Sequence, residues 1–448
     1  MKMIEVRKLF PVMKMQDSIW TKTASMPSFP PLTGDAKTDV LVIGGGMAGL
    51  LSAYMLRQAG VDCLVIEADR IAGGVTANTT AKITSQHGLI YHKLLRKFDP
   101  DTVLKYYLAN QEALEEYSRL AGHILCDFEV KDSFIYAQED EALLDAELEA
   151  LFQLGIPAEL VHSLPLPIST CGAVCFRDQA QFHPLKFLAG LAENMNIREQ
   201  TRALKIEKGR VLTDRGWIRA EKIIVATHFP ILNRRGLSFM KQYQDRSYVL
   251  ALEGAQNVKG MHLDGVGNGF SFRNQGDVLI LGGSGHRTGK KSIGWEPLSA
   301  FAQAYYPGSR EMARWAAQDC MTLDDIPYIG QYSPHTPWLY VATGFNKWGM
   351  TGSMVSAIVL RDEILGRENP CARIFDPARG MLWPQLAANA WESTLNLLTP
   401  TRPRCPHQGC ALKWNPLEHS WDCPCHGSRF DHTGHLLDNP AIKDLERE

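Results

Sequence analysis

Apolar residues along this chain recur in two spacings, and the alternation between them predicts the elements of its first part. Residues 39–43 form a nearly continuous apolar run, typical of a strand buried on both faces of a parallel sheet. Three glycines follow in G-x-G-x-x-G spacing, and apolar residues then recur at helical spacing to about residue 56. A second apolar run covers residues 61–66. This order predicts a strand, a glycine turn, a helix and a second strand.

Two other patterns fill the middle of the chain. Apolar residues recur at helical spacing over residues 91–120 and 139–154, and the charged positions between them fit solvated faces. Residues 160–182 and 243–285 contain short β-like runs separated by turns. These segments therefore predict long amphipathic helices and a further set of strands.

The glycine turn supplies the first candidate chemistry. Gly44, Gly46 and Gly49 permit a tight turn, close approach of the backbone to a pyrophosphate and close helix–strand packing. The N-terminus of the following helix faces the phosphates. Glu67 ends the second strand, where its carboxylate is placed to bind ribose hydroxyls. Because all of these features occur in order, the segment predicts a dinucleotide site.

Two cysteine–histidine boxes near the C-terminus supply the second candidate chemistry. Residues 405–410 read C-P-H-Q-G-C, and residues 423–428 read C-P-C-H-G-S. Together they offer two thiolates and two imidazoles, the ligand set of a [2Fe-2S] centre in which two His replace two Cys on one iron. A tetrahedral zinc site is the alternative, but zinc pairs usually have C-x₂₋₄-C spacing, and here each box pairs Cys with His and carries a further Cys. The boxes therefore favour an electron-transfer centre.

Bulk properties narrow the class of protein. A chain of 448 residues with 45% hydrophobic composition is long enough for two or three units with buried cores. A net charge of −2 without basic runs gives no electrostatic footprint for nucleic acid or an anionic membrane.

The only long apolar stretch, residues 40–56, is interrupted by glycines, so we expect no membrane span. The six cysteines outside the boxes have no metal spacing, and we expect buried thiols in a reducing cytoplasm.

The boxes resemble those of the Rieske iron–sulfur proteins over roughly residues 404–445. The resemblance implies four cluster ligands in two pairs, one pair for each iron: Cys405 with Cys423, and His407 with His426. It also implies a disulfide between Cys410 and Cys425 beneath the cluster.

Three further positions bear on the redox potential of that cluster. Ser428 matches the hydroxyl donor to a cluster sulfur in this family, but Phe430 stands where quinol-oxidising members usually have Tyr, and Gln408 stands where they have Leu. A lost donor lowers the potential, since donors stabilise the reduced cluster. We therefore expect a potential below that of the quinol-oxidising relatives, and Gln408 argues against docking into an apolar quinone pocket.

Two further segments complete a second resemblance. Residues 222–226 form an apolar strand that runs into the pair Ala226-Thr227, and residues 338–352 form a strand that leads through glycines into a helix. With the glycine turn, these segments resemble the FAD-dependent oxidoreductases of the D-amino-acid oxidase and glycine oxidase group over about residues 38–365, specifically γ-glutamylputrescine oxidase-like members with a C-terminal Rieske domain. The resemblance implies FAD, with residues 70–83 wrapping the pyrophosphate and approaching the flavin.

The expected FAD-binding residues come from all of these segments. They are Gly44, Gly46, Gly49, Glu67, Ala68, Thr79, Thr80, Ala81, Ala203 beside the adenine, Ala226, Thr227, Gly344, Lys347, Trp348, Gly349 and Met350. The alternative for Thr79 and Thr80 is that they are loop hydroxyls, and residues 222–227 are alternatively plain sheet core.

The expected fold class is an α/β FAD-binding Rossmann-like domain with an inserted α+β substrate-domain sheet, plus a small all-β Rieske domain at the C-terminus. The proline-rich residues 399–404 mark the boundary. The expected divisions are an N-terminal extension (1–36), the oxidoreductase (37–398), a linker (399–404) and the Rieske domain (405–448). Within the oxidoreductase we expect FAD-binding elements at 37–90, 200–232 and 325–366, and substrate-domain segments at about 91–199 and 240–324.

The function expected from this combination is flavin-dependent oxidation of an amine or amino acid. Electrons would pass from FAD to the [2Fe-2S] cluster and on to an external acceptor. Candidate substrate-facing residues are Tyr248, Arg273, His286 and Arg287, and no catalytic base is evident. One alternative is an NAD(P)H-fed reductase that supplies an oxygenase, although no second G-x-G-x-x-G occurs. The other is a non-catalytic redox sensor.

Overall fold

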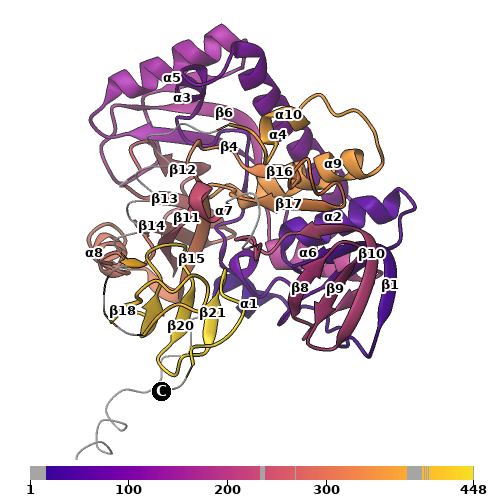
Figure 1. Ribbon diagram of the computed structural model, residues 1–448. Helices are drawn as coiled ribbons and strands as arrows, with labels where there is room; N and C mark the ends of the chain where they lie inside the picture. Colours follow the sequence, from indigo (N-terminus) through magenta and orange to yellow (C-terminus); the bar gives the residue numbers. More distant parts are fainter. Residues whose placement is uncertain are drawn as a thin grey trace, which may run out of the picture.

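The strands of the described residues form three sheets, arranged as three lobes of one molecule (Figure 1). The computed structural model describes residues 17–232, 238–267, 269–380, 396–397, 399, 401 and 403–446. Residues 1–16 of the predicted extension and residues 400 and 402 of the predicted linker 399–404 therefore lie outside the described residues.

The first sheet contains the strands predicted around the glycine turn. Its order is β16-β17-β10-β1-β2-β7, and every neighbouring pair is parallel except β16 with β17. The strands are β1 (Ala36–Ile43), β2 (Cys63–Ile66), β7 (Ile197–Arg198), β10 (Gly216–Val225), β16 (Tyr328–Gln331) and β17 (Leu339–Thr343). In this order β10 lies beside β1 and β17 lies beside β10, although both are distant from β1 in sequence, so the carboxyl ends of the three parallel strands lie at the edge that carries the glycine turn.

Helices α2 (Met47–Gln58) and α9 (Gly349–Ile364) pack against each other beside this sheet. Most residues of both helices are buried, which is why their sequences are apolar on nearly every face. Each helix begins directly after a glycine-containing turn at the carboxyl end of a strand. Their N-termini therefore lie at the same edge of the sheet.

The second sheet is mostly antiparallel and corresponds to the predicted substrate-domain strands. Its order is β15-β11-β14-β13-β12-β4-β6-β3, with β5 beside β6. The strands are β3 (Lys82–Ile83), β4 (Glu129–Ala137), β5 (Glu159–Val161), β6 (Gly172–Gln181), β11 (Gln242–Glu253), β12 (Met261–Asp264), β13 (Ser271–Gln275), β14 (Val278–Arg287) and β15 (Arg310–Thr322). Since β3 follows the loop at 79–81, this sheet joins the first one beside the predicted flavin position.

The helical spacing over residues 91–120 corresponds to two helices. They are α3 (Tyr91–Leu95) and α4 (Pro100–Ala121). Asp99 caps α4 by accepting a hydrogen bond from the Thr102 amide, and Pro100 occupies the first turn. Both are helix-start signals, so the chain begins a new helix there. The second predicted helix is α5 (Glu141–Leu154).

The third sheet is a small antiparallel meander, drawn in yellow in Figure 1 near β11 and β15. Its strands are β18 (Lys413–Asn415), β19 (Ser420–Asp422), β20 (Arg429–Asp431) and β21 (Leu436–Asp438). The remaining described elements are α1 (Ile19–Thr23), a 3₁₀ turn η2 (Val75–Asn78), α6 (Pro184–Ala192), α7 (Ser238–Lys241), α8 (Glu296–Tyr305), α10 (Ala372–Phe375), β8 (Ala203–Glu207) and β9 (Arg210–Thr213).

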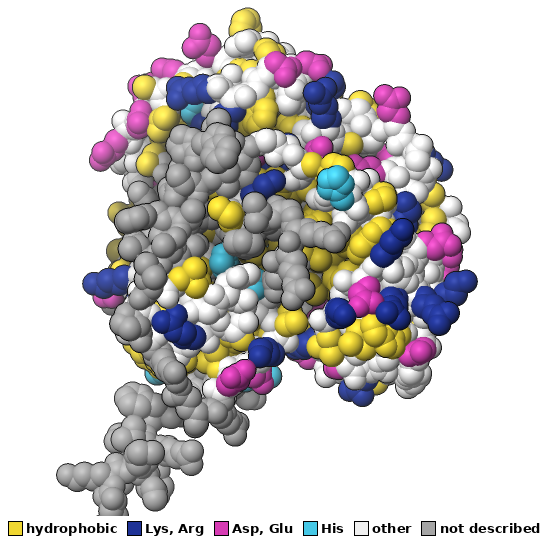
Figure 2. All heavy atoms as spheres, in the orientation of Figure 1, with side chains coloured by type: hydrophobic (Ala, Val, Ile, Leu, Met, Phe, Trp, Pro, Cys, Tyr) yellow, Lys and Arg dark blue, Asp and Glu magenta, His cyan; other side chains and the backbone are white. Residues whose placement is uncertain are grey.

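Charges of both signs are interspersed over the described part of the face drawn in Figure 2, as the small net charge suggests. Within the described ranges, no helix combines the length and the apolar character that crossing a bilayer requires.

Candidate functional site

A cavity of about 770 Å³ lies where the first two sheets and the C-terminal meander meet. Its volume is within the range of small-molecule and cofactor pockets. Most of the predicted FAD-binding residues line it: Gly44, Gly46, Glu67, Ala68, Thr79, Thr80, Ala203, Ala226, Thr227, Lys347, Trp348, Gly349 and Met350. Gly49, Ala81 and Gly344 are not part of the lining.

The glycine turn at the centre of this cavity depends on close backbone packing. A Cβ atom at Gly49 would lie 1.9 Å from the carbonyl oxygen of Gly44, so no other residue fits there. Gly46 precedes α2 and brings no side-chain cap, although the Met47 amide donates to the Thr76 hydroxyl at 3.1 Å. The turn and the N-terminus of α2 both line the cavity, which fits a pyrophosphate.

Glu67 lies at one end of the cavity, as the position of the second strand predicts. Its carboxylate accepts hydrogen bonds from the amides of Gly45 at 2.8 Å and Asp69 at 3.0 Å. Burial raises the pKa of Glu67, and these amide hydrogen bonds partly offset that effect. Ala203 and Arg202 line the same end, which fits an adenosine moiety.

The loop at 79–81 is held on both sides by buried side chains. The indole of Trp20 donates to the Thr79 carbonyl at 2.7 Å. Arg273 is fully buried and donates to the carbonyls of Thr80 at 3.0 Å and Ala81 at 2.7 Å. Arg273 therefore positions this loop and is not part of the cavity lining.

A lysine that the sequence reasoning did not single out follows this loop. Lys82 lines the cavity and donates to the Ser271 hydroxyl at 2.5 Å. Burial, helped by the charge of Arg273, lowers the pKa of Lys82 to about 7. Its place directly after Thr79-Thr80-Ala81 was the only signal in the sequence, and that signal does not separate a site residue from a surface lysine.

A second lysine lies at the start of α9. The Lys347 ammonium forms an ion pair with Asp245 at 2.7 Å and donates to the Ser247 hydroxyl at 3.2 Å. Burial acts to lower its pKa, but the charges of Asp245 and Asp319 outweigh burial and raise it. Asp319 also lines the cavity, and burial raises its pKa to about 6. This end of the cavity therefore holds groups that can bind polar substrate atoms and exchange protons.

The four substrate-facing candidates lie in different surroundings. Of the four, only Tyr248 lines the cavity. Arg273 holds the loop described above. His286 stacks on Tyr248 with ring centroids 5.8 Å apart, and Arg287 lies over Tyr243 and donates to the Cys425 carbonyl at 3.4 Å.

The two cysteine–histidine boxes form matching loops at one end of the meander. In each box the first Cys amide donates to a carbonyl at the end of the box, and the Gly amide donates back to the first Cys carbonyl. The Cys405 thiol lies next to the Cys423 thiol and the Ser428 hydroxyl. The rings of His407 and His426 lie 5.0 Å apart. The boxes therefore bring two sulfurs and two imidazoles together, which fits a [2Fe-2S] centre.

Cys410 and Cys425 form a disulfide in the structure, as the resemblance implies. Both sulfurs lie within 4.8 Å of the Cys423 sulfur. Phe430 is fully buried in the core of the meander, whereas Gln408 is exposed. The six cysteines outside the boxes are free thiols, and five of them are buried.

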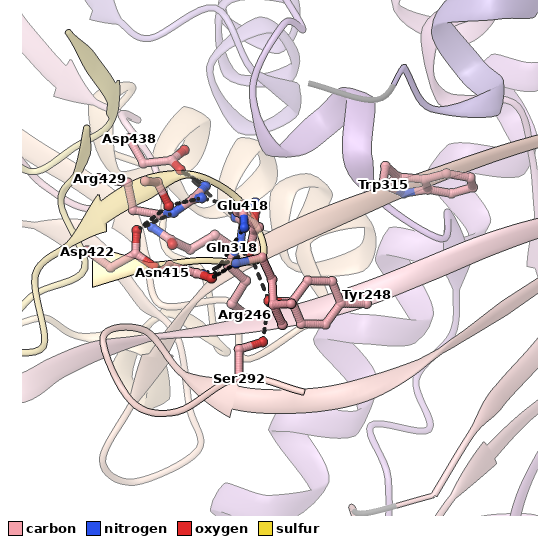
Figure 3. A network of polar contacts seen from close by, with 12 residues as sticks. Arg246, Tyr248, Ser292, Trp315, Gln318, Asn415, Glu418, Asp422, Arg429 and Asp438 are labelled. Atoms are coloured by element: carbon pink, nitrogen blue, oxygen red, sulfur yellow. Dashed lines mark hydrogen bonds and ion pairs between the residues drawn. The ribbon is translucent and has the colours of Figure 1, made fainter. Parts of the chain in front are cut away.

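A buried ion-pair cluster joins the meander to β11, and we call it the charged anchor (Figure 3). Arg246 on β11 forms an ion pair with Glu418, and the Tyr248 hydroxyl donates to the same carboxylate at 2.9 Å. Arg429 lies on the other side of Glu418 at 3.0 Å and also binds Asp422 at 2.9 Å. The side chains of Arg246, Glu418 and Arg429 are 7%, 8% and 2% exposed, so this contact is shielded from water.

A chain of amide hydrogen bonds joins the same domains beside the second box, and we call it the amide bridge. Gln244 donates to the carbonyls of His426 at 3.0 Å and Asn439 at 2.9 Å. Gln318 donates to the Gln244 side chain at 2.7 Å and to the Gly427 carbonyl at 2.9 Å. Asn439 in turn donates to the Thr227 carbonyl.

Gly427 shows how closely the two domains approach at the amide bridge. It has a φ of +83°, and a Cβ atom there would lie 2.6 Å from the Cβ of Gln244. A glycine is therefore required both by the turn and by the neighbouring domain. The phenyl ring of Phe229 also lies 6.2 Å from the His426 ring.

These features define a flavoprotein oxidoreductase that carries an iron–sulfur domain on the same chain. Residues 39–363 match the family described as FAD dependent oxidoreductase, and residues 394–447 match the Rieske [2Fe-2S] domain. The chain thus belongs to the FAD dependent oxidoreductase family and has a Rieske domain at its C-terminal end. Its cofactors are FAD and a [2Fe-2S] cluster, and it is an FAD-dependent oxidoreductase.

Individual relatives agree with this assignment. The Rieske 2Fe-2S iron-sulfur protein YhfW of Bacillus subtilis (strain 168) is 34% identical, over 96% of this chain and 97% of that protein. The structure of glycine oxidase from Geobacillus kaustophilus superposes with a TM-score of 0.65 at 17% identity, covering 78% of this chain and 100% of that one. L-proline dehydrogenase from P. horikoshii gives 0.64 at 17%, covering 77% and 98%. These comparisons confirm the expected fold class, family and cofactors.

Proposed function

We propose that this protein oxidises the C–N bond of an amine or amino acid and passes the electrons from FAD to the Rieske cluster and then to an external acceptor. The observation that carries the proposal is the amide bridge. It links Thr227, on the wall of the flavin cavity, to the backbone of His426, a proposed ligand of the cluster.

The roles of the lining residues follow from their positions. The glycine turn, Glu67 and Ala203 would hold the adenosine diphosphate part of FAD, and the segments 79–81 and 347–350 would hold its flavin. When bound, FAD accepts an electron pair from the substrate, and the cluster accepts electrons singly. The proposed ligands are Cys405, Cys423, His407 and His426.

The substrate class is inferred from the fold and from the charges at one end of the cavity. Proteins with this fold include enzymes named glycine oxidase and L-proline dehydrogenase. Lys82 and Lys347 supply positive charge near the proposed flavin position, which suits a carboxylate, and Asp319 suits an amine. Tyr248 is the substrate-facing candidate that we retain, because it alone of the four reaches the cavity.

The protein is proposed to work in a reducing cytoplasm. The support is the six free thiols, five of them buried, which coexist with a single disulfide enclosed beneath the cluster. The acceptor is proposed to be a small carrier or protein that reaches the exposed side of the first box, where Gln408 lies.

An anaerobic screen of amines and amino acids tests the proposal, with flavin and cluster absorbance followed together after mixing. The expected result is flavin reduction by at least one amine, followed by cluster reduction in the same molecules. Flavin reduction without cluster reduction would remove the cluster from the electron path. Flavin reduction by NAD(P)H and by no amine would favour the reductase alternative, and no reduction by any compound would favour a redox sensor.

A further inference from the structure

One segment of the iron–sulfur domain lines the flavin cavity itself. The lining includes His435, Leu436, Leu437, Asp438, Asn439, Ala441 and Ile442, together with residues of the glycine turn and of β8. This segment contains β21 and the turn that follows it, and it contains none of the proposed cluster ligands. Its position therefore calls for an explanation separate from electron transfer.

Contacts at two of its positions, Asn439 and Leu436, place the segment along one half of the cavity. Asn439 donates to the carbonyls of Thr227 and, at 2.9 Å, of Phe229, just after β10. Ala226, the neighbour of Thr227, packs against Gly44 so closely that a Cβ on that glycine would lie 2.4 Å from the Ala226 oxygen. This end of the segment thus lies beside the pyrophosphate turn.

The other end lies near the predicted adenine position. Asp444 accepts a hydrogen bond from the Leu436 amide at 2.9 Å, which lowers its pKa, and the nearby charge of Arg202 lowers that pKa further. Arg202 lines the cavity next to Ala203, at the end where Glu67 also lies. Residues 435–442 therefore run between the adenine end of the cavity and the pyrophosphate turn.

The side chains of the segment are divided between its own domain and the cavity. Leu436 packs against the core of the meander, where Phe430 is buried. Leu437 and Ile442 lie outside that core, are only half-buried and line the cavity. Two apolar side chains that face a cavity instead of their own core indicate a surface built to contact a bound group.

We propose that residues 435–442 of the Rieske domain form one wall of the FAD site and cover its adenosine diphosphate half. Leu437 and Ile442 contact the adenosine, and Asn439 ties this wall to the pyrophosphate turn. Release of FAD then requires this segment to move away from β10. The Rieske domain thereby retains the flavin. The inference rests on FAD being the cofactor and not on the proposed substrate or electron path.

The test uses the full-length protein with both cofactors and three variants. Asn439→Ala removes the tie to β10, and the double variant Leu437→Ala/Ile442→Ala removes the apolar contact without touching the core of the Rieske domain. Leu417→Ala is the matched control, because Leu417 meets the other domain at Gly294 but does not line the cavity. Cluster absorbance confirms in each case that the Rieske domain is folded.

Flavin fluorescence after dilution measures the rate of FAD release. We expect FAD release to accelerate by about tenfold or more in Asn439→Ala and in the double variant, because each loses one or two contacts. The release rate of Leu417→Ala should stay unchanged. With FAD-depleted protein that keeps its cluster, both variants should bind ADP more weakly and FMN as tightly as the wild type.

Wild-type release rates and ADP affinity in both cavity variants would overturn the proposal. Equal weakening of ADP and FMN would overturn the assignment to the adenosine diphosphate half. Because these measurements use neither substrate nor electron transfer, their failure is distinguishable from failure of the proposed function.

Discussion

The charged anchor and the amide bridge join the same two domains but are built from opposite chemistry. In the charged anchor, Arg246 and Arg429 enclose the Glu418 carboxylate, so removal of any partner leaves a buried charge. In the amide bridge, Gln244 and Gln318 form neutral hydrogen bonds to the backbone beside His426. We therefore expect the charged anchor to hold the domain in place and the amide bridge to align its cluster.

Glu418→Ala is expected to have the largest effect on stability. It leaves Arg246 and Arg429 buried without their shared partner, which costs about 3–5 kcal/mol in the free energy of unfolding. Denaturant unfolding followed by cluster absorbance measures the loss. Glu311→Ala is the control, since Glu311 pairs with Arg314 on an exposed surface and its removal should cost less than about 1 kcal/mol. Equal losses in the two variants would show that the anchor does not hold the domain.

Gln244→Ala is expected to destabilise the protein less than Glu418→Ala does, and to slow electron transfer more. It leaves the carbonyls of His426 and Asn439 without this donor, at a cost of about 1–3 kcal/mol. The rate of cluster reduction after anaerobic flavin reduction should fall. Gln331→Ala removes an amide that binds Ser333 away from the domain junction and should leave that rate unchanged. If Gln244→Ala transfers electrons at the wild-type rate, the distinction between anchor and bridge is wrong.

Acid should weaken the anchor and leave the bridge intact. Burial alone would raise the pKa of Glu418, but Arg246 and Arg429 outweigh it and hold that pKa well below its usual range. The stabilisation is therefore fully present above the pKa of an unfolded Glu, about 4.3, and is lost as the pH falls below it toward the folded value.

A comparison of wild type with Glu418→Gln from pH 7 to pH 3 measures this dependence. Their difference in unfolding free energy should be constant down to about pH 4.3 and should shrink below it. A difference that is the same at pH 3 and pH 7 would contradict the role of the carboxylate. The same series with Gln244→Ala should show no such trend, because an amide does not titrate in this range.

The smallest expected effect concerns the cluster itself and not its attachment. Phe430→Tyr adds a hydroxyl to a fully buried position in the Rieske core. If it donates to a cluster sulfur, a hydrogen bond of about 1 kcal/mol raises the midpoint potential by roughly 40 mV. Redox titration measures this, with Phe430→Leu as the control that adds no donor. An unchanged or lower midpoint in the tyrosine variant would contradict the prediction.

Sequence reasoning succeeded where the chemistry is local. The glycine turn and the cysteine–histidine boxes each occupy a few consecutive residues, so their types and spacing determine most of what they can bind. Gly49, Ala81 and Gly344 were also expected to bind FAD, but they do not line the cavity. Gly49, for example, is required by packing against the Gly44 carbonyl and not by contact with the cavity.

The domain junction was not predictable, because its partners lie far apart in the sequence. Gln244 and His426 are 182 residues apart, and Arg246 and Glu418 are 172 apart. Hydrophobic periodicity does not indicate which polar side chains of a strand meet another domain. The same limitation applies to Arg273, whose buried guanidinium supports the loop at 79–81, and to residues 435–442, whose apolar positions resemble those of any short strand.

The burial of His426 has a kinetic consequence. This imidazole is only 2% exposed, with Phe229 and the amide bridge on the side of the flavin domain. A separate Rieske protein added in solution cannot occupy that position while the chain's own domain is docked. Under the proposed electron path, reduction of the cluster by the flavin would be a first-order process within one molecule, with a rate that stays the same however far the protein is diluted. A chain that has lost its cluster would then not be rescued by another chain that still carries one.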